Sequence, residues 1–126
     1  MSDAALSPFF KSIVEQETSP VIICDTEHTI IYMNPAAALA EARHGGYALL
    51  GESLLDCHSP ESVNKIIEVF SWFMEDRASN IVHTFYNEEK NKDVYMVALR
   101  GAEGELIGYY EKHLFRDRDD SGFYDL

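Results

Sequence analysis

Residues 20–37 read PVIICDTEHTIIYMNPAA, and this stretch decides how the chain folds. It holds two short apolar runs rich in β-branched residues, 21–25 and 29–33, with only Thr-Glu-His between them. Runs of this composition, joined by so short a connection, predict a β-hairpin. Asn34-Pro35 then ends the second strand, because the residue before a proline avoids helical backbone while proline suits a first helical turn. We therefore expect Asn34 to cap a helix, with a ligand contact as the alternative role of its side chain.

Helices are expected to follow this corner. Residues 36–43 have high helix propensity and stop at a pair of glycines, and a short helix is expected around 53–56. The longest helix is expected to begin at Pro60, with Ser59 as its cap, and to end at 76–80. We expect its residues Ile66, Phe70 and Phe73 to pack on the sheet, opposite Val21, Ile23, Ile31, Val97 and Leu99.

Three longer strands are expected at 81–87, 93–100 and 105–115. Both alternating sets of side chains in 94–99 are largely apolar, so we expect both faces of the sheet to be covered. The internal helices would cover one face, and the N-terminal helix or a second subunit would cover the other. This order predicts an α+β domain with a five-stranded antiparallel sheet and helices inserted between strands 2 and 3.

An amphipathic helix is expected before the hairpin, with Ser7-Pro8 as its start. Its apolar residues recur at three- and four-residue spacing and comprise Leu6, Phe9, Phe10, Ile13 and Val14. A stripe of this size should not stay in water, so we expect it to form the interface of a homodimer. The chain then divides into this helix (1–19), one domain (20–117) and a C-terminal tail (118–126).

Composition limits the partners of the chain. Its 126 residues make one domain, and 46% hydrophobic against 25% charged residues is typical of a folded protein. The net charge of −12 repels phosphate groups, so we expect neither nucleic acid nor an anionic membrane as a partner. The sequence shows no signal peptide and no apolar run long enough to span a bilayer, which favours a cytoplasmic location. Two cysteines do not make a disulfide framework, and we expect reduced thiols.

Cys57 and His58 are the sharpest candidates for a binding role. A thiolate and an imidazole are good zinc ligands, and either can ligate haem iron. The alternative is structural: His58 bonds to backbone at a helix entrance, and Cys57 points inward as an inert small hydrophobe, which we favour. Glu111 and His113 share one face of the last strand, where they either tune a proton or a metal or form an exposed surface pair.

Nothing in the sequence indicates catalysis. There is no glycine-rich phosphate loop, no nucleophile elbow and no His-Glu-x-x-His sequence. We therefore do not expect an enzyme.

Several of these segments together resemble a PAS domain. Residues 20–25 followed by 30–37 resemble its opening, with an apolar strand ending in Asp and a second strand running into Asn-Pro-Ala-Ala. Leu50-Gly51, the stretch 58–61 (His-Ser-Pro-Glu) and the stretch 104–108 resemble later parts of the family in the same order. The segment around Cys57 is similar to a bacterial subgroup that carries Cys-His-Pro-Pro, with Ser59 here in place of the first proline.

The resemblance implies a sensory or interaction domain in signal transduction, with a pocket between the sheet and the internal helices. It implies a small ligand or a cofactor such as haem in that pocket, or a signalling protein as partner, and it favours the homodimer. Flavin photochemistry would need a cysteine within Asn-Cys-Arg, and neither cysteine has that setting. The candidate ligand contacts are Asn34, Cys57, His58, Phe70, Tyr95 and Val97. The alternative function is a dimerisation adaptor whose interior is filled by side chains.

Overall fold

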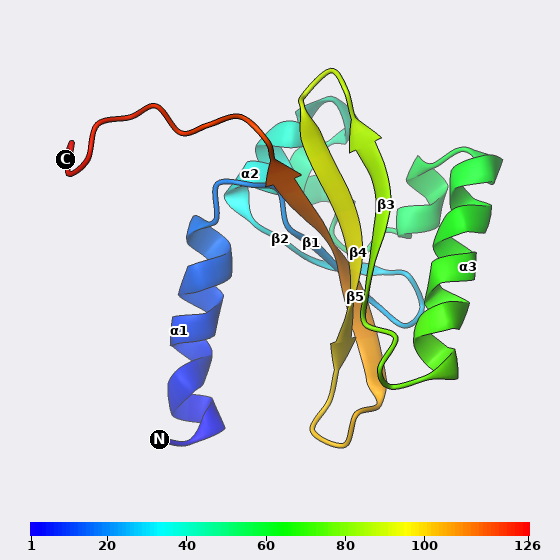
Figure 1. Ribbon diagram of the computed structural model, residues 1–126. Helices are drawn as coiled ribbons and strands as arrows, with labels where there is room; N and C mark the ends of the chain where they lie inside the picture. Colours follow the sequence, from blue (N-terminus) through cyan, green and yellow to red (C-terminus); the bar gives the residue numbers. More distant parts are fainter.

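The computed structural model describes residues 1–126 and contains one five-stranded antiparallel sheet with the strand order β2-β1-β5-β4-β3. Helices lie between β2 and β3 in the chain, and a further helix precedes β1 (Figure 1). The predicted α+β fold is therefore confirmed. The elements are α1 (Asp3–Gln16), β1 (Ile22–Asp25), β2 (Ile30–Met33), α2 (Pro35–Ala40), η1 (Ala42–His44), η2 (Gly46–Leu49), η3 (Leu54–Cys57), α3 (Pro60–Glu75), β3 (Ile81–Asn87), β4 (Lys92–Arg100) and β5 (Leu106–Phe115).

Asn34 holds the corner between β2 and α2. Its side-chain oxygen accepts hydrogen bonds from the backbone N–H groups of Ala37 and Val21, each at 2.9 Å. Its side-chain amide donates to three carbonyls of the segment 14–19, at 3.0–3.1 Å. Asn34 is fully buried, so these bonds join α1, β1 and α2 at one point. The predicted cap is confirmed, and every hydrogen-bonding atom of the side chain is used inside the protein.

The core lies on the face of the sheet that is turned toward the helices after β2. We call this the inner face. Its buried members include Val94, Met96 and Ala98 of β4, and Phe73 of α3 is the largest fully buried side chain. Cross-strand neighbours share a face, so Tyr109, paired with Ala98, also belongs to it.

The predicted partners of α3 were mostly on the wrong face. Val97 and Ile23 both pair with Tyr110, on the outer face of the sheet, and Leu99 lies on the same outer face. Ile31 is exposed, and Val21 alone of the five is buried. The reason is that both side-chain sets of β4 are apolar, so the alternation itself did not identify which set faces the core.

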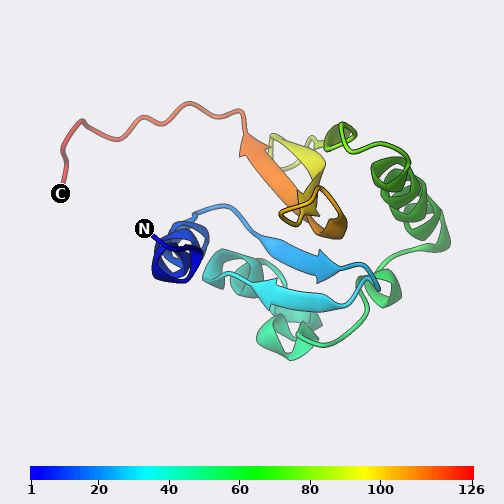
Figure 2. The same cartoon turned by 90° about the horizontal axis from the view of Figure 1, so that it is seen from below.

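Helix α3 packs on the core as predicted, with Phe73 fully buried near its C-terminal end and Ile66 and Phe70 partly buried. At that end the Arg100 guanidinium of β4 donates to the Phe73 carbonyl at 2.7 Å. Toward the N-terminal half, a groove of about 560 Å³ separates α3 from β3 and β4, with Ile66, Val82 and Met96 among its lining residues. Figure 2 shows α3 standing apart from the strands at the edge of the molecule.

Helix α1 starts earlier than the sequence indicated. Its cap is Ser2, whose hydroxyl accepts from the N–H of Ala5 at 3.1 Å, so Pro8 lies inside the helix rather than at its first turn. Besides the hydrogen bonds of Asn34 to the segment 14–19, the hydroxyl of Tyr32 in β2 donates to Glu15 and attaches α1 to the domain. No residue of α1 is buried, and the helix projects away from the sheet (Figure 1). None of the helices combines the length and the apolar character that crossing a membrane requires.

Candidate functional site

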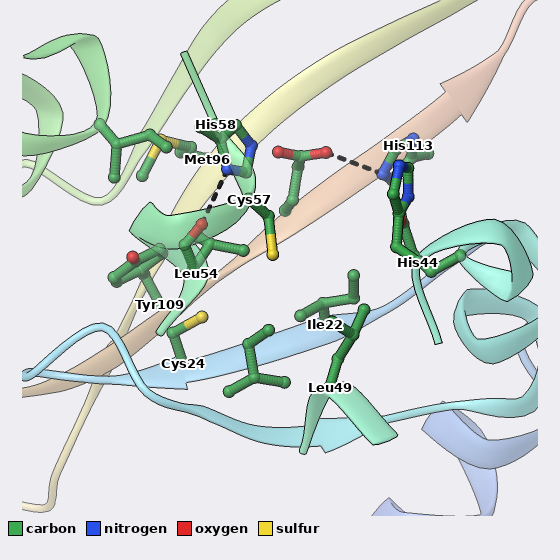
Figure 3. A pocket seen from close by; sticks show the side chains of 14 residues that line it. Ile22, Cys24, His44, Leu49, Leu54, Cys57, His58, Met96, Tyr109 and His113 are labelled. Carbon is green, nitrogen blue, oxygen red and sulfur yellow. Dashed lines mark hydrogen bonds and ion pairs between the residues drawn. The ribbon is translucent and has the colours of Figure 1, made fainter. Parts of the chain in front are cut away.

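A cavity of about 220 Å³ lies between the inner face of the sheet and the helical segment that follows β2. The hairpin contributes Ile22, Cys24 and Ile30, and the strands β4 and β5 contribute Met96, Tyr109, Glu111 and His113. The helical segment closes the opposite side with Glu41, His44, Leu49, Leu54, Cys57, His58 and Ile66. The lining is therefore mainly apolar, with a small number of polar side chains (Figure 3).

The buried end of the cavity is a neutral hydrogen-bonded network. The hydroxyl of Tyr109 lies 2.8 Å from Nδ1 of His28, and the buried Cys24 thiol interacts with Tyr109. Burial raises the pKa of Cys24 to about 12, raises the pKa of Tyr109 and lowers the pKa of His28. All three groups are therefore uncharged at neutral pH, and Cys24 is not a reactive thiolate.

The aromatic wall behind this network comes from α3. The ring of Phe70 meets the ring of His28 edge-to-face at 4.8 Å and lies 6.1 Å from the ring of Tyr109. His28 lies in the turn between β1 and β2 and has a φ of 65°. Phe70 thus supports the residues that line the cavity without lining it.

Cys57 and His58 both line the cavity at the end of η3. Nδ1 of His58 lies 2.8 Å from the carbonyl oxygen of Leu54 (Figure 3). A carbonyl only accepts, so Nδ1 carries the proton and Nε2 keeps a free lone pair. Cys57 is exposed although its side chain lines the cavity, so the expectation of a buried, inert thiol beside Phe70 was wrong.

The surroundings of Cys57 and His58 do not complete a metal or haem site. No group of three or more His, Cys, Asp or Glu side chains is arranged to hold a metal ion. A cavity of about 150 Å³ accepts benzene, so about 220 Å³ suits a single-ring molecule. A porphyrin is far larger than this, and haem does not fit the cavity in its present shape.

Four polar residues form what we call the polar end of the cavity: Glu41, His44, Glu111 and His113. Nδ1 of His44 lies 3.0 Å from a Glu41 oxygen, and Nε2 of His113 lies 3.1 Å from a Glu111 oxygen. In Figure 3, His44 and His113 lie at the end of the cavity away from Tyr109 and Cys24.

The two pairs of the polar end differ in burial. The His113 side chain is only 11% exposed, and its Nδ1 is buried without a hydrogen-bond partner, whereas the His44 side chain is 69% exposed. The sequence placed Glu111 and His113 on one face, but the favoured surface pair was wrong for His113. Its neighbour across the sheet is Val94, which is fully buried. Glu41 and His44 were missed, because only the folding back of η1 and η2 brings them to the cavity.

Two of the predicted ligand contacts lie on the outer face. Tyr95 stacks on His83 with ring centroids 4.8 Å apart, and Val97 pairs with Ile81 and Tyr110. They are one residue out of phase with Met96, which does line the cavity. Asn34, as described above, has no free hydrogen-bonding atom. Of the six predicted contacts, Cys57 and His58 lie at the cavity.

Known proteins share this architecture. The PAS domain of a protein from Colwellia psychrerythraea superposes with a TM-score of 0.61 at 10% identity, covering 87% of this chain and 96% of that one. The PAS domain of BvgS from Bordetella pertussis gives 0.58 at 14% identity, covering 90% and 88%. The Aer2 receptor from Vibrio cholerae, described as a dual PAS-haem oxygen sensor, gives 0.54 at 16% identity, covering 79% and 96%.

At these identities the structural similarities establish the fold alone. A search of curated protein sequences gives no significant match. The family model for the PAS fold, in contrast, matches residues 14–118, which is most of the chain. The chain therefore belongs to the PAS fold family, whose domains serve in sensory signal transduction.

Proposed function

We propose that this PAS domain senses a small molecule that binds in the cavity between the inner face and the helical segment after β2. The observation that supports this is the lining itself, in which apolar side chains from the hairpin, β4 and η3 surround a space with a few polar groups at one end. Such a combination gives a ligand both apolar burial and orientation. With about 220 Å³ available, the ligand is a compact molecule of one ring or of similar bulk.

Neighbouring residues on β1 offer a matched test. Ile22 lines the cavity, whereas Ile23 faces the outer groove beside α1. Ile22→Trp should fill the cavity, and Ile23→Trp should leave it open while adding the same bulk to the same strand. The ligand is sought by mass spectrometry of a denatured extract of each purified protein, with an absorbance spectrum to detect haem or flavin.

We expect a small molecule to co-purify with the wild type and with Ile23→Trp but not with Ile22→Trp. Equal recovery from both variants would place the ligand elsewhere. Absence of any ligand, with no small molecule able to stabilise the protein, would favour the dimerisation adaptor instead. A Soret band lost on His58→Ala would mean that the cavity opens far enough to hold haem.

We also propose that α1 mediates a homodimer. Phe9, Phe10 and Ile13 on this helix are 60%, 59% and 67% exposed, so the helix does not cover the sheet of its own subunit. An apolar groove of about 550 Å³ between the end of α1 and the outer face, which includes Val21 and Leu99, offers a second copy a surface to pack on. Sedimentation should show a dimer at tens of micromolar. A monomer at that concentration, or a dimer unaffected by Phe9→Asp with Phe10→Asp, would exclude this interface.

A further inference from the structure

The hydrogen-bonding roles of the cavity histidines are set by partners that can only accept. The Leu54 carbonyl accepts a hydrogen bond from the Nδ1–H of His58. The Glu41 carboxylate accepts a hydrogen bond from the Nδ1–H of His44, and the Glu111 carboxylate accepts one from the Nε2–H of His113. In each neutral ring the other nitrogen carries a lone pair. Nε2 of His58 and Nε2 of His44 can accept a hydrogen bond from a ligand, whereas Nδ1 of His113 is fully buried and has no hydrogen-bond partner.

The other polar atoms of the cavity are mainly acceptors, and the Cys57 thiol is a weak donor among them. The Tyr109 hydroxyl is paired with Nδ1 of His28, and Cys24 is buried close to Tyr109. Glu41 and Glu111 each use one oxygen on a histidine, which leaves the second carboxylate oxygen of each without a protein partner. The lining therefore offers mainly hydrogen-bond acceptors when its histidines are neutral, with the weak Cys57 thiol as the exception.

The charge of the lining also favours a ligand that donates hydrogen bonds, because it attracts cations. Its carboxylates, Glu41 and Glu111, give the lining its negative charge. Lys92 of β4 is buried, does not line the cavity and places its Nζ 5.5 Å from the ring centroid of Phe115, although its charge also acts on Glu111 and Glu41. Two carboxylates against one ammonium leave the polar end negative, within a chain whose net charge is −12.

We propose that the ligand of this cavity is a small organic ammonium compound, with an apolar ring or alkyl body toward Tyr109 and its N–H groups at the polar end. This inference rests on the proposed sensory function of the same cavity. An ammonium group has three donors and a positive charge, which complement carboxylate oxygens and imidazole lone pairs. A carboxylate ligand would meet like charge and no strong donor, and an alcohol would use one donor without the charge attraction.

Three probes of nearly equal size separate these cases: 2-phenylethylamine, 2-phenylethanol and phenylacetate. Each is titrated at pH 8 and low salt, and binding is followed through the NMR signals of the cavity methyl groups of Leu54 and Met96. We expect 2-phenylethylamine to bind about fivefold or more tightly than 2-phenylethanol, in keeping with partly exposed carboxylates, and phenylacetate to bind weakest.

Charge-neutral variants assign the preference to the polar end. Glu41→Gln and Glu111→Gln should each weaken binding of the amine and leave binding of the alcohol unchanged. Glu89→Gln, in the exposed turn after β3, makes the same change in net charge far from the cavity and should leave both affinities unchanged.

Each outcome decides one of the two proposals. Binding of phenylacetate or 2-phenylethanol as tight as that of the amine would overturn the ammonium inference and leave the sensory cavity standing. An amine preference that Glu89→Gln reduces as much as Glu111→Gln would mean that the charge of the whole chain selects the cation, which also overturns it. If none of the probes shifts the cavity methyl signals, the cavity is closed to small molecules and both proposals fail.

Discussion

Replacing Asn34 by aspartate tests the corner on which the fold depends, because the new side chain keeps the shape and loses the donors. The two hydrogen bonds that the Asn34 oxygen accepts would remain, whereas the three that its amide donates would be lost. A protonated aspartate retains one donor, so two bonds at about 1 kcal/mol each would be missing and the free energy of unfolding should fall by about 2 kcal/mol. An ionised aspartate has no hydrogen to donate, so its second oxygen would lie against the three carbonyl oxygens that the Asn34 amide now contacts.

The loss should therefore grow with pH. Burial against carbonyl oxygens raises the pKa of this aspartate in the folded state, so the folded protein holds its proton more tightly than the unfolded chain. Stability is then lost as the pH rises above the ordinary aspartate value of about 3.9, by about 1.4 kcal/mol per pH unit until the folded-state pKa is reached. At pH 7 we expect a total loss of about 4–6 kcal/mol, a large part of the stability of a small domain.

Urea unfolding followed by the fluorescence of Trp72, the single tryptophan, measures this at pH 5 and pH 7. Asn87→Asp is the matched control, because the Asn87 oxygen only accepts, from the N–H of Lys90 at 3.0 Å, and an aspartate can replace it. If Asn34→Asp costs no more than Asn87→Asp at pH 7, the Asn34 amide does not hold the end of α1, and the account of this corner is refuted.

Phe73→Ala should cost about 3–5 kcal/mol in the same assay and Phe70→Ala clearly less, since Phe73 is fully buried and Phe70 only half-buried; equal losses would contradict this placement of α3. A thiol reagent at pH 8 should label Cys57 rapidly and Cys24 only after unfolding, because burial raises the pKa of Cys24 to about 12, and fast labelling of two thiols would show that the cavity end is open. The pKa of Asp93 is lowered chiefly by its hydrogen bonds with Arg116, so the free energy of unfolding should decline as the pH falls through the lowered pKa of Asp93. In Asp93→Asn the free energy of unfolding should change less between pH 5 and pH 3. If its pH dependence is the same as in the wild type, the Asp93–Arg116 pair does not stabilise the sheet.

The sequence predicted the elements well because each is marked by local chemistry. Proline after Asn34 and proline after Ser59 mark the starts of α2 and α3, and β3 was predicted with its observed bounds. The helix expected over 36–43 was too long, because α2 ends at Ala40 and the chain continues in 3-10 turns, one of which begins at Gly46. The start of α1 was wrong because Ser7-Pro8 and Ser2 both offer a plausible cap, and the residues before Ser7 also form helix in the structure.

The faces of the sheet were harder to predict than its strands. In β4 the inner set with Met96 and the outer set with Val97 are equally apolar, so choosing Tyr95 and Val97 as ligand contacts was a choice of phase that hydrophobicity did not determine. The polar end of the cavity was only half visible for a different reason. Glu111 and His113 are two residues apart on one strand, whereas Glu41 and His44 reach them through a chain of short turns whose path no periodicity records.

The guanidinium of Arg100 gives α3 an ending that the helix does not encode for itself. It donates to the carbonyls of Phe73, Asp76 and Ser79 at 2.7–3.2 Å, although it lies at least 21 residues further along the chain. Most helices satisfy their last carbonyls with a nearby glycine turn or with water. Here the Phe73 carbonyl in the last turn of α3 gains its Arg100 donor only when β4 is in place, whereas the Asp76 carbonyl also accepts from the nearby N–H of Ser79 at 3.0 Å. The last turn of α3 is therefore stabilised by a tertiary contact that the local sequence does not supply. In the order of folding, the last turn of α3 therefore follows the sheet, and a peptide of residues 59–80 alone would fray from that end.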